Sequence, residues 1–220
     1  MTGKRKDRHS RIKILIADDH PIVRQGLKHI LAEESDMAIE GEAYNSQGVL
    51  ELIRKEKGDI LILDITLPGR GGLEVLREIK RGTPKLPVLI LSMHPEEQYG
   101  VRALKAGAAG YLSKESVPEK LVEAVRTILS GRKYISPVLA EKLAWEFERD
   151  SSSPLHEGLS DREYQILCLI ASGRTLTEIA RELCLSVKTI STYRARILNK
   201  MKMKNNAELT HYAIRNRLID

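Results

Sequence analysis

Short apolar runs alternate with amphipathic stretches along the first 130 residues of the chain. Consecutive apolar residues, as in LIL and VLIL, are typical of strands buried on both faces of a sheet. The predicted strands are residues 12–17, 37–43, 59–64, 87–92 and 110–112, and the predicted helices lie near 22–33, 46–56, 72–81, 96–107 and 118–130. Five strands that alternate with five helices indicate an α/β fold, with a doubly wound parallel sheet between two layers of helices.

The pattern changes after Tyr134. SPVLAEKLAWEFERD predicts a helix capped by Ser136 with Pro137 in its first turn, and the polar segment SSSPLHEG (151–158) is typical of a flexible linker. The rest of the chain has helical periodicity. Its predicted N-caps are Ser160 and Thr175, each followed three residues later by Glu in a capping box, and Ser186. A compact all-α module of four short helices is therefore expected to follow the sheet.

The composition is that of globular material, with 42% hydrophobic and 30% charged residues. No apolar run approaches the roughly 18–20 residues that span a bilayer, and the N-terminus lacks the apolar stretch of a secretory signal. Cys168 and Cys184 lack metal-ligand spacing and lie in apolar helical patterns. We expect both to be reduced core thiols of a cytoplasmic protein.

The net charge of +6 is unevenly distributed. Residues 1–11 carry five basic residues and one acidic residue, and residues 12–150 carry 20 basic and 22 acidic residues. Residues 151–220 carry 11 basic and 7 acidic residues, which gives the C-terminal third a charge of +4. This asymmetry makes nucleic acid a natural partner of the C-terminal part, although charge alone suits a solvated surface equally well.

Polar residues stand at the carboxyl ends of the predicted strands. Asp18 and Asp19 follow the first strand, Asp64 ends the third, Ser92 ends the fourth and Lys114 follows the fifth. Because parallel strands end at the same edge of a sheet, these side chains are expected to converge. A single Asp in such a place is often only a turn former or a helix cap. Five residues at the right strand ends favour a functional site.

The chemistry of this set points to phosphoryl transfer. Three clustered carboxylates repel one another unless a cation joins them, and oxygen ligands from rigid strand ends suit Mg²⁺. A carboxylate can attack phosphorus and form an acyl phosphate. The metal and Lys114 would neutralise the charge of the transferring group, and Ser92 would hydrogen-bond one of its oxygens.

Four motifs carry a resemblance to a known family. IKILIADDHPIVRQGL, LILDITLPGRGGLEVL, VLILSMH and AAGYLSKES resemble the receiver domains of bacterial two-component response regulators, over residues 12–131. The resemblance implies a (βα)5 flavodoxin-like fold with Asp64 as the phosphoacceptor. It also implies that Mg²⁺ binds to Asp19, Asp64, the backbone carbonyl of Thr66 and, through water, Asp18. Lys114 would pair with the phosphoryl group or, without it, with Asp64.

Ser92 and Tyr111 match the hydroxyl and aromatic switch positions of that family. If Ser92 is drawn toward a phosphoryl group, space opens behind the fourth strand and Tyr111 is expected to turn inward, which would reshape the surface around residues 96–107. From the residues alone, Tyr111 is equally well a half-buried aromatic. The sequence departs from the family at Gly71, where many relatives carry Asp.

The helices predicted at 177–184 and 187–201 form a helix-turn-helix pattern, whose second helix is expected in the major groove of DNA. Its predicted apolar stripe is Val187, Ile190, Ile197, Leu198 and Met201. Small, hydroxyl-bearing and basic residues lie elsewhere on the helix, where they suit base edges and phosphates. The predicted DNA contacts are Thr175, Lys188, Thr189, Ser191, Thr192, Arg194, Ala195, Arg196 and Lys200.

LSDREYQIL, TEIARELCLSVKTIS and AELTHYAI resemble the LuxR-type helix-turn-helix, over residues 158–220. Tyr193 stands where many relatives have His. In that family the last helix, here about 205–217, commonly mediates dimerisation, and dimers would read two half-sites of DNA.

Together the two resemblances imply a DNA-binding response regulator of the NarL/FixJ group. We expect a receiver at 12–131, a linker helix and flexible linker at 132–157, and a LuxR-type domain at 158–220. The expected partners are double-stranded DNA, a cognate sensor histidine kinase and, after phosphorylation, a second copy of the chain, but no membrane. The receiver would catalyse only its own phosphorylation and dephosphorylation.

Two alternatives stay open at this point. The first is a phosphatase or phosphotransferase that uses the same aspartyl-phosphate chemistry on an external metabolite, although D-I-T at 64–66 lacks the second Asp of a D-x-D phosphohydrolase. The second is a constitutive DNA-binding protein whose receiver is structural.

Overall fold

A five-stranded parallel sheet forms the first part of the protein. The computed structural model describes residues 11–148, 154–216 and 218–219. The strands β1 (Ile12–Ala17), β2 (Met37–Ala43), β3 (Ile60–Asp64), β4 (Val88–Ser92) and β5 (Gly110–Ser113) follow the order β2-β1-β3-β4-β5. The predicted α/β fold is confirmed, because all neighbouring strands pair in parallel.

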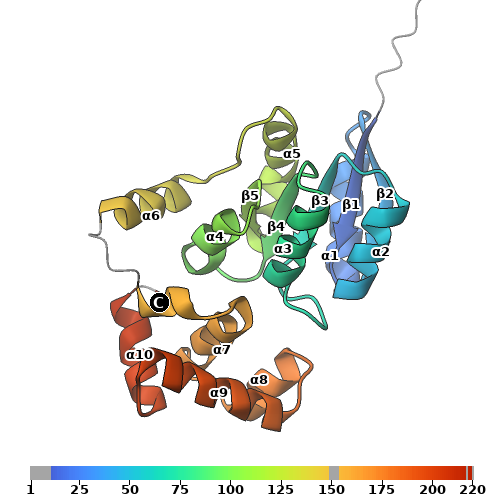
Figure 1. Cartoon of the computed structure of the whole chain (residues 1–220). Helices are drawn as coiled ribbons and strands as arrows, with labels where there is room; N and C mark the ends of the chain where they lie inside the picture. Colours follow the sequence, from blue (N-terminus) through green and yellow to red (C-terminus); the bar gives the residue numbers. More distant parts are fainter. Residues whose placement is uncertain (1–10, 149–153, 217, 220) are drawn as a thin grey trace, which may run out of the picture.

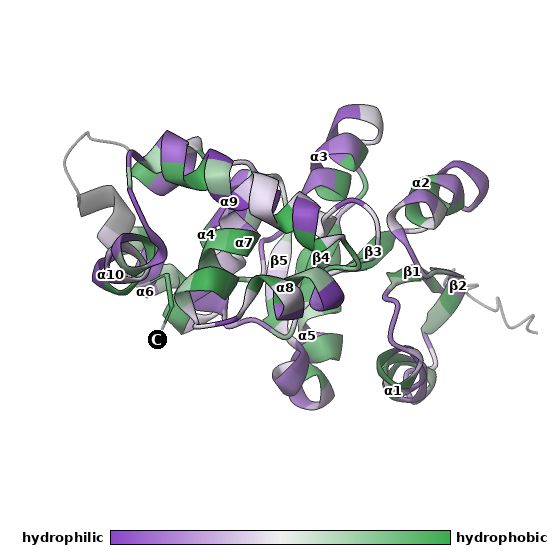
Figure 2. Ribbon diagram, turned by 90° about the horizontal axis from the view of Figure 1, so that it is seen from below, coloured by the Kyte–Doolittle hydropathy of each residue, from purple (hydrophilic) through white to green (hydrophobic). Residues whose placement is uncertain are grey.

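Helices cover both faces of this sheet (Figure 1). Helices α1 (Pro21–Ala32) and α5 (Val117–Leu129) pack on one face, and α2 (Ser46–Lys55), α3 (Gly72–Gly82) and α4 (Glu96–Lys105) pack on the other. Strand residues alternate between the two faces of the sheet. Ile62 packs in the apolar core under α1 and α5, and Leu63 packs in the core under α2, α3 and α4. In Figure 2 the central strands are hydrophobic, as strands buried on both faces must be.

The C-terminal part is helical. After α6 (Pro137–Glu148) come a short 3₁₀ turn, η2 (Leu155–Gly158), and then α7 (Asp161–Ala171), α8 (Leu176–Glu182), α9 (Val187–Met201) and α10 (Asn206–Arg215). Both predicted capping boxes, at Ser160 and Thr175, are present. The Ser186 side chain caps α9 by accepting a hydrogen bond from the Thr189 backbone N–H. No helix among the described residues is long and apolar enough to cross a membrane.

Two expectations about this part are corrected. Of the linker predicted at 151–158, residues 151–153 lie outside the described part of the chain, and residues 155–158 are not a free linker. They form the turn η2, in which Glu157 pairs with Lys105 of α4 at 2.7 Å. Cys168 is buried as expected, but Cys184 is exposed. Cys184 has a backbone φ of 53°, since it forms the left-handed turn between α8 and α9 instead of continuing a helix.

Gly71, in the loop after β3, is the N-cap residue of α3. Gly71 occupies this cap with an extended backbone and no side-chain hydrogen bond, and a Cβ at this position would meet open space. We expect Gly71→Ser to raise the free energy of unfolding by about 0.3 kcal/mol, because its hydroxyl can accept a bond from the first turn. Chemical denaturation of the full chain measures this difference.

Gly72, the next residue, has no room for a side chain and provides the contrasting substitution. A Cβ at Gly72 would lie 2.4 Å from the Asp64 backbone oxygen. Gly72→Ser should therefore lower the free energy of unfolding by more than about 1 kcal/mol. Equal effects of the two substitutions would contradict the assignment of Gly71 as an unfilled cap.

Candidate phosphoacceptor site and nucleic-acid interface

The carboxyl ends of the strands bring the predicted acidic residues together. Asp18 and Asp19 directly follow β1, and Asp64 is the last residue of β3. Asp18 and Asp64 are almost wholly buried, whereas Asp19 is partly exposed. Two buried carboxylates at one edge need compensating charge, since an isolated buried charge is costly.

Lys114 supplies that charge from the first residue after β5. Its Nζ lies 2.7 Å from Asp18 Oδ2 and 2.9 Å from Asp64 Oδ2, and its side chain is only 5% exposed. Burial lowers the pKa of Lys114, but the charges of Asp64 and Asp18 and their hydrogen bonds outweigh it and hold the pKa above its ordinary value. The ammonium group therefore stays charged at neutral pH.

The other oxygen of Asp64 is held locally. Asp64 Oδ1 accepts hydrogen bonds from the Thr66 backbone N–H at 3.1 Å and from the Thr66 hydroxyl at 2.9 Å. These two bonds and the Lys114 contact fix the orientation of the carboxylate. Thr66 thus lies beside Asp64 as expected, and its backbone carbonyl as a metal ligand stays a prediction.

Four side chains at this edge have the spacing of a metal site. Asp18, Asp19, His20 and Asp64 each offer one ligand atom, and these atoms lie within 4.8 Å of one another. Asp19 Oδ1 is buried and has no hydrogen-bond donor among the described residues. Such an oxygen set fits a hard divalent cation. His20 was missed by the sequence reasoning, although it directly follows Asp19.

The switch residues form a second connected group. Ser92 is fully buried at the end of β4, and its Oγ accepts a hydrogen bond from the His94 backbone N–H at 3.0 Å. The Tyr111 hydroxyl donates to the His94 backbone oxygen at 2.9 Å. Tyr111 is itself fully buried, and this burial raises its pKa. The expected inward rotation of Tyr111 is therefore corrected, because the ring already lies inside and its hydroxyl has an acceptor there.

The second helix of the helix-turn-helix pattern exposes its predicted polar face. Ile190, Ile197 and Met201 are buried. Val187, expected in the same stripe, is 44% exposed at the first residue of α9. The exposed residues of α9 include Lys188, Ser191, Thr192, Ala195 and Arg196.

Other predicted DNA contacts have partners within the protein. Arg194 Nε donates to Asn206 Oδ1 at 2.6 Å, and Lys200 Nζ lies 2.6 Å from Glu163 Oε2. Thr175 is engaged in its capping box, and Thr189 in a 2.8 Å contact with the Ser186 hydroxyl. Among the predicted basic contacts, Lys188 and Arg196 are therefore the better placed for an outside ligand.

Two family models match the chain. The response regulator receiver domain matches residues 14–126, which is just over half of the chain, and the luxR family of bacterial regulatory proteins matches residues 157–213. The chain belongs to the NarL/FixJ group of response regulators. Members of this group are DNA-binding regulators of transcription that act with a sensor kinase, not classical enzymes, so the metabolite phosphatase alternative is not favoured.

Relatives match over nearly their whole length. The response regulator GacA of Pseudomonas aeruginosa is 37% identical over 210 residues, which are 95% of this chain and 98% of that protein. UvrY of Escherichia coli K12 is 36% identical over 208 residues, covering 94% and 95%. A structure of RcsB from Salmonella enterica serovar Typhimurium, bound to promoter rprA with the phosphomimetic BeF3⁻, has a TM-score of 0.64 at 28% identity and covers 92% of this chain and 98% of that one.

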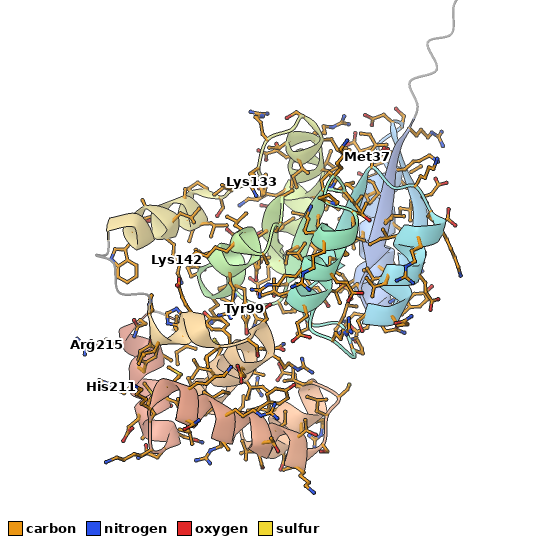
Figure 3. All side chains as sticks on the ribbon, viewed as in Figure 1. Met37, Tyr99, Lys133, Lys142, His211 and Arg215 are labelled. Carbon is orange, nitrogen blue, oxygen red and sulfur yellow. The ribbon has the colours of Figure 1, made fainter. Side chains whose placement is uncertain are left out.

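The receiver of this response regulator contacts its LuxR-type unit (α7–α10) through α4 and through Arg77 of α3, which lies 3.2 Å from Asp161 Oδ1. Arg102 Nε of α4 lies 2.7 Å from Asp161 Oδ1, at the start of α7, and its guanidinium also donates to the Leu159 backbone oxygen. The Tyr164 hydroxyl of α7 donates to the Gln98 backbone oxygen at 2.7 Å. Tyr99 is 2% exposed and meets the Tyr164 ring edge-on, with ring centroids 5.4 Å apart. Figure 3 shows Tyr99 at this junction.

Proposed function

We propose that this response regulator accepts a phosphoryl group on Asp64 with Mg²⁺, and that phosphorylation controls its dimerisation and sequence-specific binding to DNA. The functional parts would be a receiver at 12–131, a connecting segment at 132–157 and a LuxR-type domain at 158–220. The observation that carries the proposal is the buried Asp64 carboxylate, with Lys114 2.9 Å from one of its oxygens and Asp18 and Asp19 beside it.

The chemistry follows from these neighbours. An Asp64 oxygen would attack the phosphorus of a phosphohistidine or a small acyl phosphate, forming a new P–O bond as the bond to the donor breaks. Lys114 would then exchange its contact with Asp64 for the phosphoryl oxygens, and Ser92 would donate a hydrogen bond to one of them. Asp19, Asp64, the Thr66 carbonyl and, through water, Asp18 would hold Mg²⁺, which when bound neutralises charge on the transferring group. The same residues would later serve hydrolysis of the acyl phosphate.

Asp64→Asn should abolish phosphoryl uptake from radiolabelled acetyl phosphate in the presence of Mg²⁺, because the amide is not a nucleophile. Label retained on the denatured full chain measures uptake. Asp36→Asn is the matched control, since Asp36 pairs with Arg126 on the surface and should leave labelling unchanged. Full labelling of Asp64→Asn would refute the assignment of the phosphoacceptor.

DNA recognition would reside on the exposed face of α9. Lys188 stands in the first turn of the helix, and Thr192 lies one turn further along on the same face. A side-chain ammonium and a methyl-bearing hydroxyl suit phosphate and base-edge contacts. The structures of RcsB bound to DNA, at 28% identity, support this role by similarity.

The double variant Lys188→Ala/Thr192→Ala should bind DNA fragments selected by the unaltered protein at least about tenfold more weakly, since each lost contact is worth about 1 kcal/mol or more. Fluorescence anisotropy at fixed salt measures the dissociation constants. Thr83→Ala/Lys85→Ala removes the same two side-chain types from exposed positions of the receiver and should have no effect. Equal affinities of the two double variants would reject α9 as the reading helix.

The α4–α7 contact offers a route from Asp64 to the LuxR-type unit. The His94 ring lies 5.0 Å from the Tyr99 ring, and the His94 backbone N–H binds the Ser92 hydroxyl. If Ser92 moves toward a phosphoryl group, that bond breaks and His94 shifts against Tyr99. Tyr99 in turn packs on Tyr164, so phosphorylation would loosen the hold of α4 on α7. Dimerisation, mediated by α10, would follow from this release.

Arg102→Ala should release the LuxR-type unit without phosphorylation, because it removes the shorter of the two ion pairs of the buried Asp161 and the hydrogen bond to the Leu159 backbone oxygen. We expect the loss of these contacts to cost about 2 kcal/mol or more. Small-angle X-ray scattering should then give a larger radius of gyration for the unphosphorylated variant than for the unaltered protein. Arg54→Ala, on the exposed surface of α2, controls for loss of an arginine. An Arg102→Ala chain as compact as this control would contradict the proposed route.

A cytoplasmic location follows from the same proposal, since both the chromosome and the phosphodonor domain of a sensor kinase are reached there. Release of α7 from α4 would also explain how the receiver controls a DNA-binding unit whose proposed reading face is exposed even while the two parts are in contact.

A further inference from the structure

His20 is a fourth side chain at the acidic edge, and the phosphoryl transfer described above makes no use of it. It stands between β1 and α1, directly after Asp19. Its Nδ1 lies 2.9 Å from Asp19 Oδ1 and 4.0 Å from Asp64 Oδ2, and it is hydrogen-bonded to Asp18 Oδ1 at 3.2 Å. The ring therefore faces three carboxylates from the open side of the site, where 57% of its side chain is exposed.

These distances resemble the edges of one coordination sphere. In an octahedral site with bonds of about 2.1 Å, neighbouring ligand atoms are about 3.0 Å apart and opposite ones about 4.2 Å apart. The contacts of His20 Nδ1 with Asp19 and Asp18 have the shorter spacing, and its distance to Asp64 approaches the longer one. The nitrogen thus has the position of a further ligand beside the carboxylate oxygens.

The buried oxygen of Asp19 supports the same interpretation. Although His20 Nδ1 and Asp19 Oδ1 are 2.9 Å apart, Asp19 Oδ1 is a buried oxygen without a hydrogen-bond donor among the described residues. The same ring nitrogen is hydrogen-bonded to Asp18 Oδ1 at 3.2 Å, so the imidazole is already oriented toward two of the carboxylates that would hold the ion. His20 is also held from its backbone, whose N–H donates to Asp18 Oδ1 at 2.8 Å.

We propose that His20 is a nitrogen ligand of the metal in this receiver, and that it gives the site a preference for divalent transition ions over Mg²⁺. The inference rests on the proposed phosphoacceptor function. Mg²⁺ takes oxygen ligands and retains water, whereas imidazole suits the later first-row ions, whose affinity for nitrogen rises along the series. Every divalent ion can use the three carboxylates, but only a transition ion gains substantially from the imidazole.

The test compares Co²⁺ and Mg²⁺ binding to the full chain by isothermal titration calorimetry. His20→Ala should weaken Co²⁺ binding at least about tenfold, as expected for a lost imidazole contact, and should change Mg²⁺ binding less than about threefold. His29→Ala removes a more exposed histidine from α1, 83% exposed, and should alter neither ion. Equal losses for Co²⁺ and Mg²⁺ in His20→Ala, or no loss for either, would overturn the proposal.

A spectroscopic measurement identifies the ligand directly. Pulsed electron paramagnetic resonance of Mn²⁺ bound to the full chain should show coupling to a directly bound nitrogen, which changes from ¹⁴N to ¹⁵N when the protein carries ¹⁵N-labelled histidine. The signal should vanish in His20→Ala and persist in His29→Ala. Bound Mn²⁺ without histidine coupling would overturn the role of His20 while leaving the proposed function intact. Failure of Asp64 to take up phosphoryl groups would instead count against the proposed function.

Discussion

The interaction on which the rest of the protein depends is that of Lys114 with two buried carboxylates. Asp18 and Asp64 are held at the end of the sheet because one ammonium group lies within 2.9 Å of both. The group is still electrostatically unbalanced, since Asp19 adds a third carboxylate beside them. Under the proposed function, a cation would bind at this edge, and an incoming phosphoryl group would compete with both carboxylates for Lys114. In that proposal, the negative charge of a phosphoryl group changes the contacts that Lys114 makes with Asp18 and Asp64.

The change of contacts can spread because Ser92 and His94 share a hydrogen bond. Ser92 is fully buried, so its hydroxyl cannot exchange partners with solvent, and any movement toward Asp64 removes the partner of the His94 backbone N–H. Tyr111 then has a different role from the one expected of it. Its ring is already inside, and its hydroxyl anchors the His94 backbone from the other side. Tyr111 thus restrains the His94 backbone, which lies in the loop directly before α4.

Local patterns predicted most of the fold, and contacts between distant segments account for what they did not predict. The strands were evident because a strand buried on both faces must be apolar at every position, as in β3 and β4. The convergence of Asp64 and Lys114 followed from parallel topology alone. The burial of Tyr111 depends on an acceptor from the loop after β4, which no periodicity reveals. Cys184 was misjudged because a left-handed turn interrupts the helical pattern there, and its only signal was the short LCL connection.

The arrangement of the two parts limits what kind of control is possible. If the receiver acted by covering the reading helix, α9 would be the surface in contact with α4. The contact is instead made by α7, whose residues are all buried, while Lys188, Thr192 and Arg196 of α9 are exposed. The contact therefore leaves the proposed DNA-reading face of α9 exposed and fixes its direction relative to the receiver. A dimer reads two half-sites only when both reading helices have the right separation. This structure therefore fits a mechanism in which release of α7 and pairing of two chains set the separation of the reading helices. It fits less well a mechanism in which the receiver covers α9 and blocks DNA binding.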